Sequence, residues 1–468
     1  MNLAEQFADF TGHQASKMIV ELLRVVSDER LIQLTYLGEK LTSDDEVLEA
    51  IRGVRNLLQT PGHPAKQLFR GILEYLPPKN RTVIFHTLFN NAWFHGNKKR
   101  NLFEKEHGFR PPFVMILSPT WQCNLRCKGC YTLGYQRHPG LPYDLVKRIL
   151  SEAMEMGLYF VTVLGGEPFM YPSLFQMIAE HPQMFFQVYT NGTLMTSEKA
   201  QRLSELGNAM VVLSCEGYEE ETDRWRGPGV FRKIMEAMDH LREARVLFGS
   251  SATVTRNNVE VVASEEWIDF LLSKGVIAQM YFLYLPVNGH GDMNLMVTPE
   301  QRNHLRKQVK YFRAAKPLFV LDFWNDGPHV KGCIAGGRRY FHINANGDVE
   351  PCVYTHVAMH NIRDVSLAEA LNSPLFRAIR RRQPHNENHL RPCMIIDNPH
   401  IFREVIEETK PYFTHKGADE IVKDLGPEMD AYAARYGDLA ERVWREEYLK
   451  TPSGKTCWTS SLQEIAPV

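Results

Sequence analysis

The stretch SPTWQCNLRCKGCY, residues 118–131, holds three of the eight cysteines of the chain in the pattern Cys-x3-Cys-x2-Cys. It follows directly on Phe113–Leu117, an apolar run of the length of a β-strand. Three closely spaced thiolates can bind three corners of a [4Fe–4S] cluster and leave one iron open. A structural zinc normally takes four ligands in pairs, and no fourth is nearby. The spacing therefore favours a cluster bound by Cys123, Cys127 and Cys130, with zinc or buried thiols as the alternatives.

Further apolar runs of strand length alternate with segments of helical spacing. The strand-like runs are Phe113–Leu117, Phe160–Leu164, Phe185–Tyr189, Met210–Leu213, Gly249–Thr253 and Met280–Leu285. The helical segments include Leu145–Met156, Ser197–Leu206 and Val230–Ala244. This alternation indicates parallel pairing, in an open sheet or a barrel. Because the runs are continuously apolar, we expect helices to cover the strands.

The composition is that of an ordinary globular protein. The 54 Lys and Arg balance 55 Asp and Glu, and the resulting net charge of −1 excludes a broadly basic nucleic-acid surface. No apolar run reaches the roughly 18 residues of a membrane span, and the N-terminus has no secretory signal pattern. We therefore expect a cytoplasmic protein with reduced thiols that serve as metal ligands or lie buried.

Short polar motifs follow three of the strand-like runs. They are Gly165-Gly166-Glu167 after the second run, Thr190-Asn191 after the third, and Ser214-Cys215-Glu216 after the fourth. Ligands bind at the carboxyl ends of strands in α/β folds, and paired glycines let a ligand approach the backbone. Each motif alone is equally typical of a turn. Alternation along the fourth run predicts Ser214 and Glu216 on the inner face and Cys215 packed on the outer face.

In this order, the cysteine loop and the motifs that follow it resemble the radical S-adenosylmethionine (radical SAM) superfamily, over roughly residues 113–290. The resemblance implies that the three cysteines ligate a [4Fe–4S] cluster whose open iron binds S-adenosylmethionine (SAM). It also implies that the reduced cluster splits SAM into methionine and a 5′-deoxyadenosyl radical, which takes a hydrogen atom from the substrate. Glu216 and His290 are the expected catalytic candidates, and a loop histidine without a role is the alternative for His290.

The resemblance also implies a set of SAM contacts. The expected contacts are Gly165, Gly166 and Glu167 at the methionine amine, Thr190, Asn191 and Ser214 near the sugar and methionine, and Arg226 at the carboxylate. For Arg226 the alternative is a surface arginine at a helix start. Relatives commonly have an aromatic residue directly before the third cysteine, but this chain has Gly129 there and Tyr131 after it. This departure leaves the adenine-stacking contact open.

A second group of cysteines, Cys333, Cys352 and Cys393, lies around a predicted β-hairpin. The hairpin is Tyr340–Asn344, the turn Asn346-Gly347-Asp348, and Val349–Tyr354. Residues 318–397 resemble the SPASM domain of radical SAM enzymes in its shortened twitch form. That resemblance implies that the three cysteines ligate an auxiliary [4Fe–4S] cluster; zinc or buried cysteines are the alternatives.

The fourth ligand of the auxiliary cluster is open. A twitch domain can carry a further cysteine in a Cys-x2-Cys pair, but that position here is Ile396. The candidates are therefore Asp397, His400, Cys457 or the substrate itself.

The sequence thus predicts an α/β protein with a partial (β/α)6 radical SAM barrel, an N-terminal helical domain and a small C-terminal twitch-like cluster domain. The expected divisions are 1–107 (helical domain), 108–317 (barrel), 318–399 (auxiliary cluster domain) and 400–468 (helical tail). All the expected SAM contacts fall at the carboxyl ends of strands, where β/α barrels have their active sites.

The expected reaction is SAM-dependent hydrogen abstraction from a lipid-like or other small molecule, since residues 1–107 contain no recognisable peptide-recognition domain. The alternatives are modification of a peptide or protein, as SPASM and twitch relatives often do, and a non-catalytic iron–sulfur electron carrier. A flavodoxin- or ferredoxin-type electron donor is the expected partner, with no specific nucleic acid. Lys98-Lys99-Arg100 beside Trp93 and Phe94 suits peripheral membrane contact, although a solvated helix face explains the pattern as well.

Overall fold

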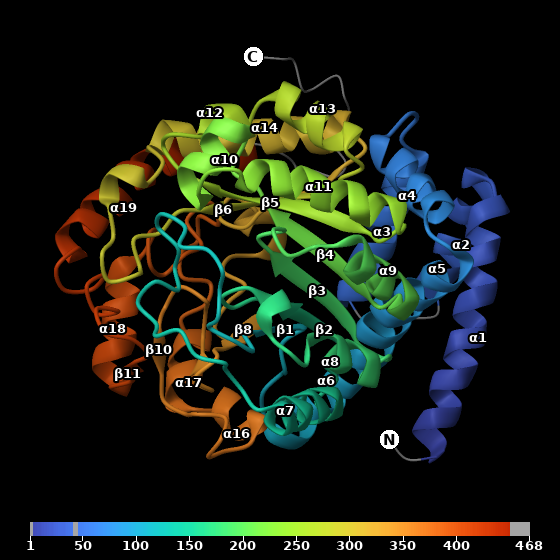
Figure 1. Cartoon of the computed structure of the whole chain (residues 1–468), viewed down its shortest axis with the longest axis horizontal. Coiled ribbons are helices and arrows are strands. Elements are labelled where there is room, and N and C mark those ends of the chain that lie inside the picture. Colours follow the sequence, from blue (N-terminus) through green and yellow to red (C-terminus); the bar gives the residue numbers. More distant parts are fainter. Residues whose placement is uncertain (1–2, 41–44, 450–468) are drawn as a thin grey trace.

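Parallel strands form where the sequence has its continuous apolar runs, and they make up the centre of the molecule (Figure 1). The computed structural model describes residues 3–40 and 45–449. The barrel strands are β1 (Val114–Leu117), β2 (Phe160–Val163), β3 (Phe185–Thr190), β4 (Ala209–Ser214), β5 (Phe248–Val254) and β6 (Ala278–Leu283). Each of these strands pairs in parallel with the next, which confirms the predicted α/β barrel topology.

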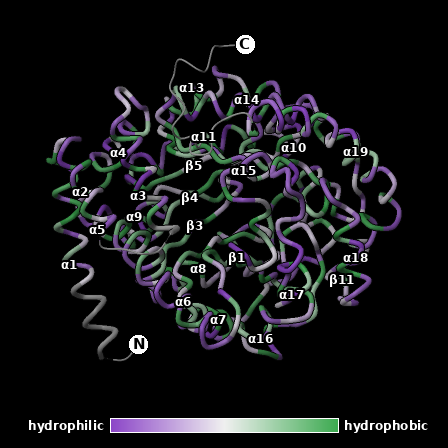
Figure 2. Tube along the Cα trace, turned by 180° about the vertical axis from the view of Figure 1, so that it is seen from behind, coloured by the Kyte–Doolittle hydropathy of each residue, from purple (hydrophilic) through white to green (hydrophobic). Residues whose placement is uncertain are grey.

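Helices cover the outer face of these strands. They are α7 (Tyr143–Glu155), η2 (Pro168–Met170), α8 (Leu174–Glu180), α9 (Ser197–Leu206), α10 (Glu219–Arg226), α11 (Val230–Glu243), α12 (Val259–Val262), α13 (Glu265–Ser273), η3 (Met293–Leu295) and α14 (Pro299–Ala315). Val146, Ile149 and Leu150 of α7 pack into the same core as the outward-facing strand residues. Figure 2 shows β3 and β4 as hydrophobic tubes surrounded by helices of mixed character. This cover explains why the strand sequences are apolar on both faces.

The sheet extends beyond the predicted barrel strands at both edges. Its order is β7-β6-β5-β4-β3-β2-β1-β8-β9, where β7 is Phe319–Asp322, β8 is Tyr340–Ile343 and β9 is Val349–Glu350. The predicted hairpin is confirmed, since β9 pairs antiparallel with β8, but β8 also pairs in parallel with β1. The second strand of the hairpin was expected to reach Tyr354 and instead ends at Glu350, because Pro351 has no N–H for the ladder. The sheet therefore crosses the expected boundary between residues 317 and 318. The expected domain divisions stay predictions.

The helical segments before β1 are α1 (Leu3–Val25), α2 (Asp28–Lys40), α3 (Asp45–Gln59), α4 (Pro64–Tyr75), α5 (Pro78–Phe85), η1 (His86–His95) and α6 (Gly96–His107). Those from α4 onward pack at the amino-terminal end of the barrel, and α1 to α3 pack on other helices. Leu76 and Ile84 pack against Phe185, Met210 and Leu247, at or beside the starts of β3, β4 and β5. These contacts place α4 and α5 opposite the carboxyl ends of the strands, where the SAM motifs lie. Across residues 3–40 and 45–449, no helix has both the length and the apolar character of a membrane span.

The C-terminal part packs beside the hairpin and α14. Its elements are α15 (Gly327–Val330), β10 (Val357–Ala358), α16 (Leu367–Leu371), α17 (Pro374–Arg380), α18 (Pro399–Thr409), β11 (Tyr412–Phe413), α19 (Gly426–Val443) and η4 (Trp444–Tyr448). The short strands β10 and β11 pair antiparallel. Arg306 of α14 forms an ion pair of 2.7 Å with Glu447 of η4. The described part of the tail, up to residue 449, is therefore fixed to the barrel.

Candidate functional site

The loop after β1 places Cys123, Cys127 and Cys130 at the carboxyl end of the strand. All three thiols are free and half-buried. The Leu125 N–H lies 3.4 Å from the Cys123 sulfur, and a guanidinium nitrogen of Arg226 lies 3.8 Å from the Cys127 sulfur. One donor from the loop and one from α10 thus lie beside the sulfur atoms of Cys123 and Cys127, where they favour the thiolate form.

The electrostatics of these thiols fit metal ligation. Burial raises the pKa of Cys123, and it raises that of Cys127 to about 12. The charge of nearby Cys130 raises both pKa values further. Bare thiolates there are unfavourable, whereas bound iron supplies the positive charge that makes deprotonation favourable. Among the described residues, no three His, Cys, Asp or Glu side chains gather closely enough to hold a single metal ion.

The Gly165-Gly166 pair fits against the backbone of the cysteine loop. A Cβ at Gly166 would lie 2.2 Å from the Gln122 carbonyl oxygen, and one at Gly165 would lie 2.5 Å from that of Thr120. The Gly166 N–H donates to Thr120 O, and the Glu167 N–H donates to Gln122 O at 2.7 Å. Only glycine permits this approach, so the motif joins the two loops that form the site.

Glu167 then fixes the end of β3. Its carboxylate accepts hydrogen bonds from the Thr190 hydroxyl at 2.7 Å, the Asn191 N–H at 2.8 Å and the Phe169 N–H at 3.0 Å. The side chain is fully buried, and burial raises its pKa against the effect of these bonds. The Asn191 amide donates to Asn124 of the cysteine loop at 2.9 Å. The predicted SAM contacts on β2, β3 and the cysteine loop therefore form one connected arrangement.

At the end of β4, the alternation of side chains is as predicted. Ser214 is half-buried on the inner face, whereas Cys215 is fully buried and lies 3.5 Å from the Thr222 hydroxyl of α10. Glu216 is buried and accepts two hydrogen bonds from Arg226, at 2.5 and 2.6 Å. The pair holds the remaining guanidinium nitrogen of Arg226 beside Cys127.

The structure does not place Arg226 at the surface or at a helix start, which was the alternative for this residue. Arg226 is the last residue of α10 rather than a helix-start residue, and its side chain is only 12% exposed. Its pairing with Glu216 shows that this glutamate orients a cation. A free carboxylate at Glu216, as a general acid or base requires, is not what the geometry provides.

Gly129 stands where relatives have an aromatic residue, and the rings of two other residues fill the space beside its Cα. Its φ of +70° is in the left-handed region, and a Cβ there would lie 2.6 Å from Trp225 and 2.8 Å from Tyr284. These two rings meet edge to face with centroids 5.9 Å apart. A side chain before the third cysteine is thus excluded by packing as well as by the backbone conformation.

The second group of cysteines comes together from three separate segments. Burial raises the pKa of Cys333, Cys352 and Cys393 to about 12, and each pKa is raised further by the charge of another member of the group. The Tyr340 hydroxyl lies 2.9 Å from the Cys352 sulfur, and the Ile395 N–H lies 3.3 Å from that of Cys393. Cys352 is buried, and Cys333 and Cys393 are half-buried. Three such thiols with hydrogen-bond donors fit cluster ligation in the same way as the first group.

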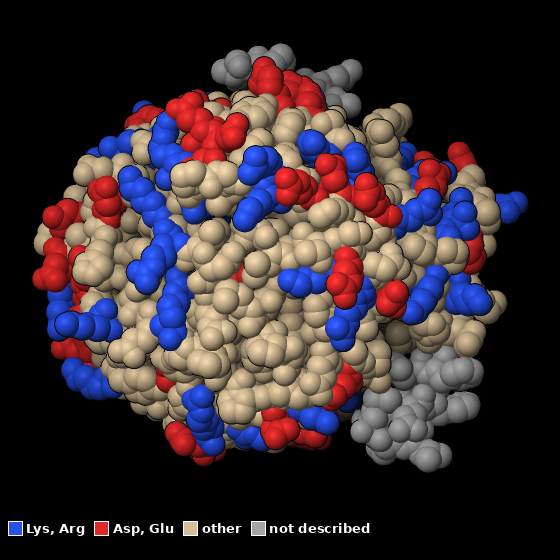
Figure 3. Space-filling view, in the orientation of Figure 1, with Lys and Arg blue, Asp and Glu red and all other residues tan. Residues whose placement is uncertain are grey.

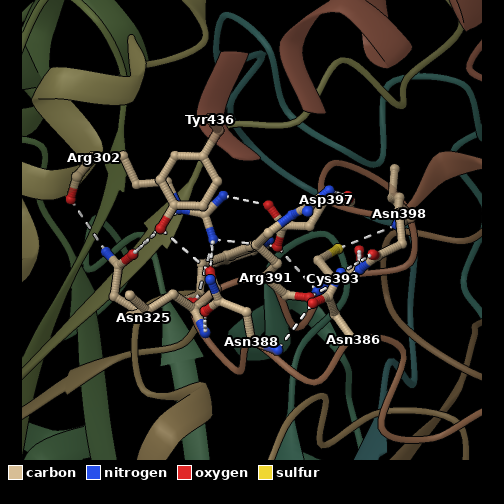
Figure 4. A network of polar contacts seen from close by, with 12 residues as sticks. Arg302, Asn325, Asn386, Asn388, Arg391, Cys393, Asp397, Asn398 and Tyr436 are labelled. Atoms are coloured by element: carbon tan, nitrogen blue, oxygen red, sulfur yellow. Dashed lines mark hydrogen bonds and ion pairs between the residues drawn. The ribbon is translucent and has the colours of Figure 1, made fainter. Parts of the chain in front are cut away.

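The turn after Cys393 is held by a buried polar network (Figure 4). The Asp397 carboxylate accepts hydrogen bonds from Arg302 at 2.6 and 3.2 Å and from the Cys393 N–H at 3.0 Å. Arg302 also stacks over the ring of Tyr436 at 3.7 Å. Asp397 is thereby committed to Arg302, which argues against it as the fourth cluster ligand. His400 is exposed, and Cys457 lies outside the described residues.

The structure also shows where two other expected sites lie. His290 is exposed, and its backbone N–H donates to Asn288, so its catalytic role stays a prediction. The Lys98-Lys99-Arg100 sequence does not form a basic patch, because Arg100 is buried and donates to Gly157 O at 2.7 Å. Lys99 donates to Met154 O at 3.3 Å. These contacts weaken the case for membrane contact at this sequence.

A buried network that the sequence reasoning missed connects the first cysteine loop to the hairpin. The Ser118 hydroxyl lies 2.8 Å from Nε2 of His342, and Nδ1 of His342 lies 2.7 Å from Glu350. Glu350 accepts a hydrogen bond of 3.0 Å from Tyr135, whose oxygen lies 2.9 Å from Nδ1 of His356. The only signal in the sequence is the polar His342 and Glu350 within apolar strands. Their pairing depends on the hairpin register and on the contact of β8 with β1.

Comparison with known proteins agrees with this geometry. Residues 117–259 match the Radical SAM superfamily, and residues 333–394 match the SPASM iron–sulfur cluster-binding domain. The AdoMet-dependent heme synthase of Methanosarcina barkeri is 29% identical over 302 residues, which cover 58% of this chain and 85% of that protein. The mycofactocin maturase MftC of Mycobacterium tuberculosis is 32% identical over 300 residues, which cover 59% of this chain and 75% of that protein.

A solved structure shows the same fold. Streptococcus suis SuiB bound to S-adenosylmethionine aligns with a TM-score of 0.56 at 18% identity, over 73% of this chain and 82% of that chain. The barrel, the cysteine loop and the matches define an enzyme, and the chain belongs to the radical SAM superfamily. More particularly, it is a radical SAM enzyme with a C-terminal SPASM iron–sulfur domain. Its cofactors are SAM, the [4Fe–4S] cluster of the superfamily and auxiliary iron–sulfur ligation in the SPASM region. When bound and reduced, these groups supply radical chemistry from SAM; the protein supplies orientation and exclusion of water.

Proposed function

We propose that this enzyme directs SAM-derived radical chemistry at an apolar small molecule held inside the barrel. In this proposal Cys123, Cys127 and Cys130 hold the first cluster, and Cys333, Cys352 and Cys393 the auxiliary one. The proposed SAM contacts are Gly165, Gly166, Glu167, Thr190, Asn191, Ser214 and Arg226. Glu216 is proposed to position Arg226, with the ion pair of 2.5 Å as its support.

Tyr354 is the observation that carries the proposal, because it lies between the two groups of cysteines. Its ring centroid is 5.9 Å from that of Tyr131, which directly follows Cys130. Burial raises the pKa of Tyr354, and the charge of Cys352 raises it further. Tyr354 is nevertheless half-buried rather than fully buried, so part of its surface stays accessible. A molecule at Tyr354 is therefore within reach of both proposed cluster sites.

The interior beside Tyr354 is lined mainly by aromatic and Met side chains, among which Gln187 bonds to Thr162 at 3.2 Å and lies 3.9 Å from the Met280 sulfur. Tyr189 and Phe282 point inward with ring centroids 5.9 Å apart, and Phe282 stacks on Phe323 at 4.6 Å. The Tyr189 hydroxyl donates to the Met280 sulfur at 2.7 Å, which leaves its ring face as the contact surface. Burial of apolar area contributes about 25 cal/mol per Å², so such a lining selects hydrocarbon or flat ring systems. The heme synthase relative, named for a product with a flat ring system, supports the ring-system part of this substrate class.

Modification of a peptide is the second candidate. The relative MftC is named a maturase, and one SuiB structure is described as bound to the precursor peptide SuiA. The placement of α4 and α5 at the amino-terminal end of the barrel favours the small molecule only in one respect: residues 64–85 do not provide a peptide-binding surface at the carboxyl ends of the strands.

The test uses the anaerobically reconstituted full chain with SAM and dithionite. One arm receives an organic-solvent extract of cells, and the other receives the peptide fraction of the same cells. We expect 5′-deoxyadenosine to rise above the substrate-free level only with the extract. A rise only with the peptide fraction would favour the second candidate, and no 5′-deoxyadenosine in either arm would favour an electron carrier.

The cluster ligands are tested separately by iron counting. We expect about eight irons per wild-type chain and about four in Cys333→Ala, because a [4Fe–4S] cluster carries four irons. Cys215→Ala is the matched control, since Cys215 is a fully buried thiol packed against α10. Equal iron in both variants would contradict the auxiliary assignment.

A further inference from the structure

Tyr340 brings a hydroxyl group directly to the sulfur of one cysteine of the second group. Its oxygen lies 2.9 Å from the Cys352 sulfur. A cysteine that binds iron is a thiolate and has no proton of its own, so the phenol is then the donor of this hydrogen bond. At Cys393, by contrast, a backbone N–H, that of Ile395, lies 3.3 Å from the sulfur. A backbone donor is present whatever the side chain, whereas the donor at Cys352 depends on the tyrosine at residue 340.

The β8–β9 hairpin holds this hydroxyl at the sulfur. The hairpin pairs His342 with Glu350, so the same register continued by two residues brings Tyr340 opposite Cys352. On its other side, β8 pairs in parallel with β1. The Thr355 N–H and hydroxyl both donate to the Cys352 carbonyl, at 3.3 and 3.0 Å. The backbone on both sides of the contact is therefore fixed.

The contact lies among apolar and aromatic side chains. Cys352 belongs to a core cluster against which Ile116, Leu164, Tyr340 and Tyr354 pack. Figure 3 shows mostly uncharged residues over the part of this face where Figure 1 draws β1 and β8. A hydrogen bond in such surroundings is electrostatically stronger than in water. The phenol is therefore well placed to withdraw negative charge from the Cys352 sulfur.

We propose that the hydrogen bond from Tyr340 to Cys352 raises the reduction potential of the auxiliary cluster. Tyr340 is then a positioning residue that acts through a ligand. The inference rests on the proposed function only through the ligation by Cys333, Cys352 and Cys393, and it does not depend on the substrate. One-electron reduction adds one negative charge to a cluster, and hydrogen bonds to its sulfur atoms stabilise the more negative state by more.

The test compares wild type, Tyr340→Phe and Tyr281→Phe after anaerobic reconstitution of the full chain. Dithionite titration followed by electron paramagnetic resonance gives the midpoint potential of each cluster, and the wave that disappears in Cys333→Ala belongs to the auxiliary cluster. We expect Tyr340→Phe to lower the equilibrium constant for reduction of that cluster about three- to tenfold, which is about 28 to 59 mV for a one-electron couple. The other wave should not move.

Tyr281→Phe is the matched control, because it removes the hydroxyl of a fully buried tyrosine that donates to Val262 O at 2.6 Å. Neither wave should move in this variant. A shift that is equal in the two variants would show a general effect of losing a buried hydroxyl and would contradict the role of Tyr340. A shift only of the wave that survives in Cys333→Ala would place the phenol at the first cluster and would contradict it as well.

Iron counting separates this inference from the proposed function. About eight irons in Tyr340→Phe, with both waves at their wild-type potentials, would overturn the role of Tyr340 and leave the auxiliary cluster in place. About four irons in wild type would overturn the auxiliary assignment and this inference with it. If only Tyr340→Phe loads about four irons, 4-fluorophenylalanine at residue 340 fills the space of the hydroxyl without a proton to donate, and the same shift is expected. A second loss of iron there would show that the hydroxyl is needed for ligation, which overturns a role in tuning the potential.

Discussion

Asp397 forms a fully buried ion pair with Arg302, and Asp397→Asn is the sharpest perturbation of the turn that carries Cys393. Both side chains have 0% exposure, and the carboxylate joins the Arg302 guanidinium to the Cys393 N–H (Figure 4). Asparagine keeps the volume but removes the negative charge. It also places an NH₂ group where an oxygen accepts hydrogen bonds.

The expected cost follows from the guanidinium that stays behind. Removing one member of a buried pair leaves a charge in the interior and destabilises proteins by about 3–5 kcal/mol. Arg302 retains other acceptors, Asn325 at 3.2 Å and Leu390 O at 3.2 Å, but these are neutral. We therefore expect Asp397→Asn to lower the free energy of unfolding by about 3 kcal/mol or more. Iron should fall from about eight to about four per chain, because the Cys393 turn loses its anchor.

Anaerobic urea unfolding and iron counting measure the two effects. Asp430→Asn is the matched control, because Asp430 pairs with Arg403 at 2.9 Å on the surface and such pairs contribute at most about 1 kcal/mol. The double variant Arg302→Met with Asp397→Leu should recover much of the lost stability, since it removes both buried charges. If Asp397→Asn loses no more stability than Asp430→Asn and keeps all its iron, the ion pair does not hold the turn.

Three further predictions concern single residues. Arg226→Ala should weaken SAM binding by about 10- to 100-fold, because a charge-assisted hydrogen bond contributes about 1.5–3 kcal/mol. Arg226→Lys should retain part of this binding energy. Calorimetry on the reconstituted chain measures the SAM affinity of both variants. Gly166→Ala should halve the bound iron measured by iron counting, because its Cβ would lie 2.2 Å from Gln122 O. Gly71→Ala is the control and should keep all its iron, because no heavy atom lies within 4 Å of a Cβ there. Burial lowers the pKa of His385 from 6.5 to about 4. As the pH drops from 6.5 to about 4, the unfolded chain takes up the proton first, so the free energy of unfolding falls. Urea unfolding at successive pH values should show a smaller fall for His385→Gln.

The sequence predicted the elements whose signals are local. The apolar runs located β1 to β6 within a few residues, because strands covered by helices have no polar face to interrupt them. The Asn346-Gly347 turn predicted the hairpin because the backbone conformation of such a turn is a property of these two residues. The spacing of Cys123, Cys127 and Cys130 likewise indicated a ligand loop without any knowledge of the fold.

The tertiary structure was needed to identify which side chains the candidate site residues pair with. Glu216 had the pattern of a catalytic carboxylate, but α10 brings Arg226 to it across 10 residues, and this pairing is the basis for the positioning role that we propose for Glu216. Asp397 had the position of a cluster ligand, but α14 supplies Arg302 from 95 residues away. A single side chain does not reveal which charge will face it after folding, because that choice depends on how distant helices pack.

By itself, the sequence determined the class of chemistry, because thiolate spacing and glycine-rich turns are local requirements of the groups they hold. Only the tertiary structure decided that β8 joins β1, which brings the hairpin with Cys352 into the barrel sheet and places Tyr354 near Tyr131. Parallel pairing of strands more than 200 residues apart leaves no local mark on the chain, since it arises from the closing of the sheet edge. The relation between the two groups of cysteines is therefore a property of the fold.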